Sequence, residues 1–92
     1  KALDKDPFRP QRYVSLAQVY RSLGQVQNAV IAINKAVEID DQNLDYIFLL
    51  GEFQAELGNK KEALEIFTRL SKLDPDNKDL KDSIKLLRSD SN

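Results

Sequence analysis

The chain repeats itself at a fixed interval, and this internal repeat restricts its possible folds more than any other feature of the sequence. The period is the number of residues that separates Gly24 from Gly58, and Pro7 and Pro75 are separated by twice this number. A shift by the same period also superposes identical residues elsewhere, namely Leu16 on Leu50, Leu23 on Leu57, Ala29 on Ala63 and Asn43 on Asn77. Most of these matches fall on small or apolar positions, which indicates that the two copies share the same packing.

The apolar residues within each period have helical spacing. Residues 16–23 and 46–57 place apolar side chains three and four positions apart. A second amphipathic run follows in each copy, over residues 26–37 and 63–70. No alternation typical of a strand competes with this pattern. We therefore predict an all-α chain with two helices in each period.

Turn-forming residues separate these helical runs. Gly24 and Gly58 follow the first run of each copy, where a residue in the left-handed conformation commonly ends a helix. The polar segments 40–43 and 74–77 follow the second run and favour turns. Asn59 begins an Asn-x-x-Glu sequence, so we expect its side chain to cap the helix that follows it.

The residues at these positions also match a known repeat. The first copy has the pattern Leu16-Ala17-x-x-Tyr20, Gly24, Ala29-x-x-x-Ile33 and Ala36, and the second has Leu50-Gly51, Gly58, Ala63-x-x-x-Phe67 and Pro75. This pattern and the length of the period resemble the tetratricopeptide repeat. The chain departs from the family at the usual first-helix Trp, which is replaced by Tyr13 and Ile47. The resemblance implies a right-handed superhelical stack of antiparallel helix hairpins.

The resemblance divides the chain into four parts. Residues 1–9 are interpreted as the remnant of a preceding repeat, residues 10–43 and 44–77 as two repeats, and residues 78–92 as a C-terminal capping helix with a polar tail. Because the sequence contains no Met, we interpret the chain as part of a longer protein.

The outward face of the first hairpin is expected to be incompletely covered, because little of the preceding repeat is present. This face includes Phe8 and Ile31. Self-association through the truncated N-terminal end is therefore a possible property of the chain.

The composition argues against catalysis. The sequence contains neither His nor Cys, which excludes the usual zinc sites, Ser-His-Asp triads and thiolate chemistry. The acidic pairs Asp40/Asp41 and Asp74/Asp76 have the positions of turn and capping residues. We therefore predict no enzyme activity, no cofactor and no metal site.

Charge and hydropathy also restrict the partners. Lys and Arg total 14 against 15 Asp and Glu, and a net charge of −1 does not suggest a surface for nucleic acid. No apolar run approaches the roughly 20 residues that cross a bilayer, so we expect no direct membrane insertion. The sequence does not indicate a cellular location.

The resemblance implies that the first helix of each repeat lines a concave groove for a partner segment. Carried over position by position, it assigns to the groove the following residues: Val14, Gln18, Arg21, Asp45, Phe48, Glu52, Glu56 and Asp82. The wider set adds four residues: Gln11, Ala55, Asp79 and Leu86. Independently of the family, these positions lie on the polar-leaning faces opposite the apolar stripes.

The wider groove set contains one cation, Arg21, and five acids, a net charge of −4, so we expect an acidic groove. The remaining surface is then slightly basic, with Lys60, Lys61, Arg69 and Lys72. We predict a scaffold that holds a protein or peptide segment, basic and with apolar anchors. Two alternatives stay open: a solvated face without a ligand, and a structural spacer or self-association segment of a larger repeat protein.

Phe48 has two interpretations: an anchor for the partner, which we favour, or a side chain packed against the neighbouring helix. Some chaperone-adaptor members of the family hold a partner's terminal carboxylate with basic and amide groups. Here Val14, Gln18 and Leu49 occupy the corresponding positions, so we do not expect that specificity.

Overall fold

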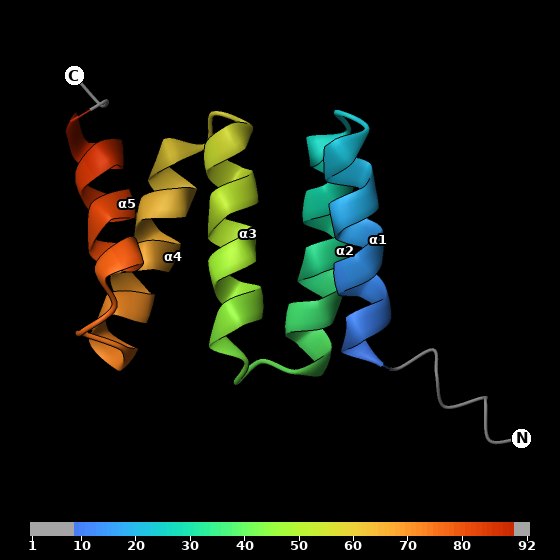
Figure 1. Ribbon diagram of the computed structural model, residues 1–92, viewed down its shortest axis with the longest axis horizontal. Helices are drawn as coiled ribbons and strands as arrows, with labels where there is room; N and C mark the ends of the chain where they lie inside the picture. Colours follow the sequence, from blue (N-terminus) through green and yellow to red (C-terminus); the bar gives the residue numbers. More distant parts are fainter. Residues whose placement is uncertain (1–8, 90–92) are drawn as a thin grey trace, which may run out of the picture.

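The computed structural model describes residues 9–89, and five α-helices form its framework (Figure 1). They are α1 (Pro10–Ser22), α2 (Val26–Ile39), α3 (Leu44–Glu56), α4 (Lys60–Leu73) and α5 (Lys78–Ser89). Residues 9–89 contain no strand, which confirms the predicted all-α class. None of the helices in this range is both long and apolar enough to cross a membrane.

The period of the sequence is also the period of the helices. Both α3 and α4 begin and end one period after α1 and α2, and α5 begins one period after α3. Structurally, α5 therefore takes the place of the first helix of a further hairpin.

The turn within each hairpin depends on a glycine. Gly24 has φ 81° and Gly58 has φ 89°, a left-handed conformation that side chains with a Cβ rarely adopt. The amide of Gln25 donates to the carbonyl of Tyr20 at 2.8 Å, and the amide of Asn59 donates to that of Gln54 at 2.9 Å. Both turns are Schellman motifs, which confirms the helix ends predicted at the glycines.

Helix α4 begins directly after Asn59, as predicted, but the expected side-chain cap is absent. Asn59 makes no side-chain cap bond; its Nδ2 instead donates to Gln54 Oε1 at 2.7 Å, because its backbone still belongs to the preceding turn. The side chains that do cap helices are Asn43, which accepts from the amide of Asp45 at 3.0 Å, and Asn77, which accepts from the amide of Leu80 at 3.0 Å. These two asparagines are one period apart and precede α3 and α5.

The buried residues form two clusters, one for each hairpin. The first lies among α1, α2 and α3, and contains Ala17, Ala29, Val30, Ala32, Ile33, Ala36 and Phe53. The second lies among α3, α4 and α5, and contains Ala63, Phe67, Leu70 and Leu80. Gly51 allows α3 to approach α4 closely, since a Cβ at this position would lie 2.5 Å from Cε1 of Phe67.

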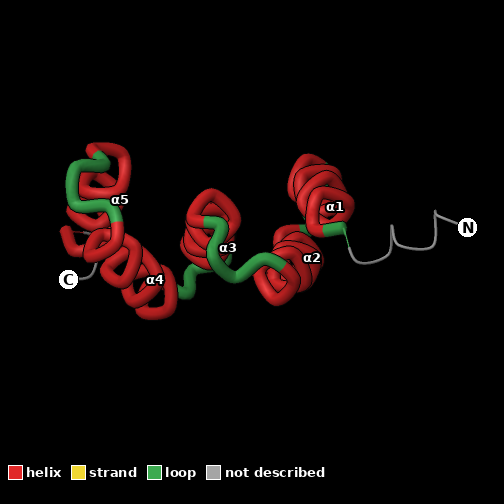
Figure 2. The backbone as a smooth tube through the Cα atoms, turned by 90° about the horizontal axis from the view of Figure 1, so that it is seen from below, coloured by secondary structure: helices red, strands yellow, loops and turns green. Residues whose placement is uncertain are grey.

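Each helix packs against the next one along the chain, and the stack curves. Figure 2 shows α1, α3 and α5 on one side and α2 and α4 on the other, with α3 set back between α1 and α5. The side formed by α1, α3 and α5 is therefore concave, and we call it the groove.

The exposed end of the first hairpin carries the apolar residues that were expected there. Ile31 is 57% exposed, as predicted, whereas Phe8 lies outside the described residues. Leu16 and Val19 of α1 and Leu23, which directly follows this helix, are exposed and form a stripe.

Candidate functional site

All eight predicted groove residues lie on the helices that form the concave side. Val14, Gln18 and Arg21 lie on α1, and Asp82 lies on α5. The remaining four lie on α3: Asp45, Phe48, Glu52 and Glu56.

Two recesses occur where α3 faces α5. The first, which we call the Asp45 recess, has a volume of about 250 Å³, and its polar lining residues are Asp45, Asp74, Asn77 and Asp79. Its apolar wall consists of Leu44, Phe48, Leu70 and Leu80. Since this volume is below the roughly 300–1,000 Å³ of a pocket for a drug-sized ligand, the recess suits a single side chain.

The second recess, which we call the Glu52 recess, lies further along the same two helices and has a volume of about 240 Å³. Its charged lining residues are Glu52 and Glu56, and its apolar wall includes Ala55, Leu86 and Leu87. Neither recess is lined by a Lys or an Arg. Asp82 lines neither of them.

Phe48 adopts the second of its two predicted interpretations. Its ring centroid lies 5.4 Å from that of Phe67 on α4, with the ring planes tilted by 42°. The side chain is half-buried and packs against the second core cluster, while it also forms part of the wall of the Asp45 recess. Phe48 is therefore a packing residue with one face open to the groove.

Arg21 is not a free cation in the groove, because it bridges two helices. Its Nε donates to Glu56 Oε2 at 2.8 Å, and its NH2 group donates to the same oxygen. Its guanidinium carbon lies 5.9 Å from the ring centroid of Phe53. The hydrogen bond and the charge of Glu56 raise the pKa of Arg21, so the groove retains a fixed ion pair between α1 and α3.

The carboxyl group of Glu52 lies in an acidic environment. Removal from water raises the pKa of Glu52, and the charges of Glu56 and Asp79 raise it further, whereas Arg21 opposes the rise. Arg21 is the one cation among the predicted groove residues, and it forms an ion pair with Glu56. The negative charges of the other predicted acids in the groove are therefore not neutralised by a cation of this set.

Sequence reasoning missed the pairing of Arg21 with Glu56. The available signal was the separation of Arg21 and Glu56 in the sequence, which is one position more than the period. This separation places the two opposite charges near each other on α1 and α3, the first helices of successive repeats. Within residues 9–89, no group of three or more acidic side chains is arranged to hold a metal ion.

Comparison with known proteins shows a family and similar chains. The family model described as anaphase-promoting complex, cyclosome, subunit 3 matches residues 1–70. The protein CTR9 homolog of Arabidopsis thaliana is 33% identical over 63 residues, which make up 68% of this chain and 6% of that protein. The chain thus spans a small part of this relative.

Among solved structures, the first TPR of Spaghetti (RPAP3), bound to the HSP90 peptide SRMEEVD, superposes with a TM-score of 0.82. The alignment covers 95% of this chain and 71% of that chain, at 22% sequence identity. At this identity, the likeness shows that the two chains share a fold.

Proposed function

The chain belongs to the family of anaphase-promoting complex, cyclosome, subunit 3, a family of tetratricopeptide repeats, and on this premise we propose that it is a protein-interaction scaffold. Family membership confirms the resemblance inferred from the sequence. The proposed role is binding rather than catalysis. The partner segment lies along the groove formed by α1, α3 and α5.

The observation that carries this proposal is the lining of the two recesses between α3 and α5. Each recess combines acidic side chains with an apolar wall, and none of its lining residues is cationic. A Lys or Arg side chain fits such a site, because its aliphatic stem packs on apolar surface while its charged end reaches a carboxylate. The partner segment is therefore basic, with apolar residues next to its cations.

The spacing of the recesses indicates how far apart the cations lie. Asp45 and Glu52 are two helical turns apart on α3, which corresponds to about 10 Å along the helix axis. An extended segment covers about 10 Å in roughly three residues. We infer that the partner places cationic side chains about three positions apart.

The acidic peptide in the RPAP3 structure has the opposite charge pattern to this expected partner. SRMEEVD contains two Glu and one Asp, whereas the recesses of this chain are themselves lined by acids. Like charges repel, so we expect an acidic peptide of this kind to bind more weakly than a basic one.

The test compares the two kinds of peptide by calorimetric titration. A peptide with Arg or Lys three positions apart, next to Leu, should bind tighter than SRMEEVD, and Glu52→Gln should weaken its binding. Glu38→Gln on α2, which lies outside the groove, is the matched control and should leave binding unchanged. Tighter binding of the acidic peptide would overturn the proposed specificity.

Self-association is a second candidate function, supported by the exposed stripe on α1. Leu16, Val19 and Leu23 correspond to Leu50, Phe53 and Leu57 of α3, one period later. The α3 residue Phe53 is only 1% exposed because it packs in the first core cluster, whereas Val19 is 53% exposed. A second copy of the chain could cover this stripe.

Sedimentation at increasing protein concentration tests this candidate. Self-association predicts a rising mass that Val19→Lys abolishes without loss of helical signal. A mass that stays at one chain at all concentrations excludes this role for the isolated chain.

A further inference from the structure

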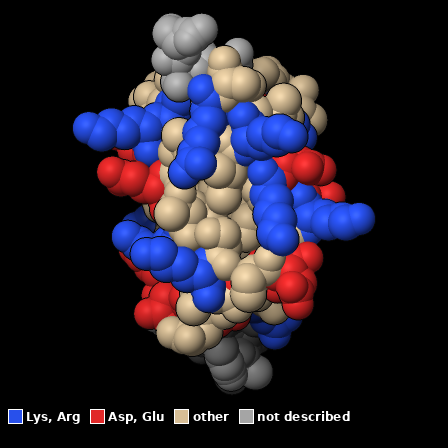
Figure 3. Space-filling view, turned by 90° about the vertical axis from the view of Figure 1, so that its left-hand side faces the viewer, with Lys and Arg blue, Asp and Glu red and all other residues tan. Residues whose placement is uncertain are grey.

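The end of the stack formed by α4 and α5 carries a surface of opposite charge to the groove. Two adjoining recesses of about 850 Å³ and 650 Å³ lie there and share Thr68 and Arg88. We call them together the end trough. Figure 3 shows this end of the molecule, where an uncharged strip runs between Lys and Arg side chains.

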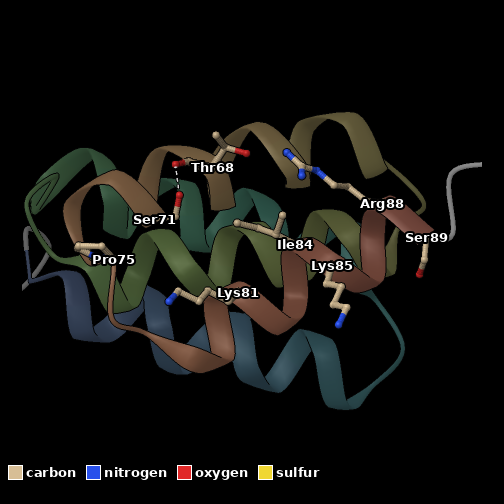
Figure 4. A pocket seen from close by; sticks show the side chains of 8 residues that line it. All are labelled: Thr68, Ser71, Pro75, Lys81, Ile84, Lys85, Arg88 and Ser89. Atoms are coloured by element: carbon tan, nitrogen blue, oxygen red, sulfur yellow. Dashed lines mark hydrogen bonds between the residues drawn. The ribbon is translucent and has the colours of Figure 1, made fainter.

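The floor of the end trough is uncharged, and its sides are basic. Leu64, Thr68 and Ser71 of α4 lie opposite Ile84 of α5, which points toward α4 in Figure 4. Six cations line the trough: Lys61, Arg69, Lys72, Lys81, Lys85 and Arg88. Glu65 is the one acidic residue among the lining residues.

The repeat geometry indicates which kind of element fits this trough. On α3, Ile47, Gly51 and Ala55 lie on the side that packs against α4 and the second core cluster. One period later, the same positions of α5 are Lys81, Lys85 and Ser89, and all three line the end trough. The end trough on α5 therefore corresponds to the surface of α3 on which α4 packs. A surface in this position suits a helix.

The residues of α5 in the end trough differ in charge from the residues of α3 that contact α4. This difference indicates the charge of the helix that would bind in the trough. Gly51 allows close approach of Phe67, whereas Lys85 at the corresponding position carries a long cationic side chain. A helix that offers negative charge to Lys81 and Lys85 therefore suits this surface better than an ordinary apolar second helix of a repeat.

We propose that the end trough binds an acidic amphipathic helix of a partner protein. The apolar stripe of that helix lies on Leu64, Thr68 and Ile84, and its Glu and Asp residues pair with the lysines on either side. This surface is separate from the groove, so the chain has two interaction sites of opposite charge. No aromatic side chain lines the trough for base stacking, and an apolar floor adds nothing to phosphate binding, which favours a protein helix over nucleic acid.

The test uses a fluorescent peptide of the same length as α4, with Leu in a helical stripe and Glu on both flanks. Fluorescence anisotropy should show binding that weakens with salt, and circular dichroism should show a gain of helix on mixing. The double variant Lys81→Glu/Lys85→Glu should weaken binding by about tenfold or more. Both lysines are exposed, so this variant should keep the fold.

Three controls make the outcome decisive. Lys35→Glu, an exposed charge reversal on α2, should leave the affinity unchanged, and so should Glu52→Gln in the groove. A peptide with Lys in place of every Glu should not bind to the end trough.

No binding of the acidic peptide, or binding of it that the double lysine variant leaves unchanged, would overturn the proposal. The Lys peptide can still bind the acidic groove, so its binding must be unaffected by the double lysine variant. If a DNA or RNA oligonucleotide binds more tightly than the acidic peptide, and the double lysine variant abolishes this binding, the end trough binds nucleic acid rather than a helix. If the chain associates with itself as its concentration rises, and the same variant abolishes this association, the end trough binds a second copy of the chain rather than a partner's helix.

Discussion

At the scale of single residues, Phe48 and Arg21 each serve packing and the groove at once. Phe48 packs beside Phe67, whose ring lies against Gly51, and the free face of Phe48 borders a recess. Arg21 joins α1 to α3 through Glu56, and it also lowers the negative charge of the groove. Substitutions at these positions therefore change stability as well as binding.

Phe48→Ala is expected to reduce the free energy of unfolding by about 2 kcal/mol, less than the roughly 3–5 kcal/mol typical of a fully buried Phe because the side chain is half-buried. Urea unfolding measures this loss. Phe48→Leu keeps most of the apolar volume and should restore much of the stability. An unchanged unfolding free energy in Phe48→Ala would contradict the packing role of this side chain.

Glu52 makes stability depend on pH in a direction opposite to that of most carboxylates. Partial removal from water and neighbouring acids raise its pKa above the ordinary 4.5, so the folded chain binds this proton more tightly than the unfolded chain. The contribution of Glu52 to the free energy of unfolding therefore falls as pH rises from below 4.5 through the raised pKa.

The substitution Glu52→Gln removes this contribution. The free energy of unfolding of the variant should therefore increase relative to that of the original chain as pH rises. Urea unfolding at about pH 4 and about pH 7 measures the difference. Glu38→Gln controls for the loss of one carboxylate on α2. A stability difference that shrinks as pH rises would contradict the raised pKa of Glu52.

At the scale of helices, the period sets where each element begins and ends. Asn43 and Asn77 occupy the same position of successive repeats and cap the helices that follow them. Because α5 forms one side of both the groove and the end trough, its first turn matters for both surfaces.

Asn77→Ala should reduce the free energy of unfolding by about 1 kcal/mol, because the amide of Leu80 loses its side-chain acceptor. Chemical unfolding measures the loss, and amide hydrogen exchange should show faster opening at the start of α5. Asn59→Ala is the matched control, since Asn59 precedes α4 without capping it, and its effect should be smaller. Equal losses in the two variants would mean that the cap bond of Asn77 contributes nothing.

The sequence allowed most of the fold to be predicted because its period and apolar spacing are local and repeated. The helices and the glycine turns at Gly24 and Gly58 follow directly from this pattern. The role of Asn59 was assigned wrongly, because a capping motif and the end of the preceding turn compete for the same residue. Local spacing could not resolve that competition.

Less of the candidate site could be predicted. The predicted groove residues lie on α1, α3 and α5, but the packing of Phe48 against Phe67 of α4 is a tertiary contact that sequence spacing does not show. The end trough was missed because residues 78–92, which include Lys81 and Lys85, were interpreted only as a capping helix with a polar tail. Comparing them with Ile47 and Gly51, one period earlier, was the signal that could have identified it.

At the scale of the whole molecule, a net charge of −1 conceals a separation of charge. Acids line the recesses between α3 and α5, while cations line the end trough on the outer side of α5. The two proposed partners, which have opposite charge, would therefore bind the same short stack without competing for one surface.

The most direct test of the central proposal is a map of the amide chemical shifts of the chain during titration with the basic peptide. A segment held in the groove predicts the largest changes on α3 and α5 around the two recesses, at Asp45, Phe48, Glu52 and Asp79, and their loss in Glu52→Gln. Changes confined to α2 and α4, or no binding of the basic peptide at all, would contradict the proposal that the groove is the docking surface.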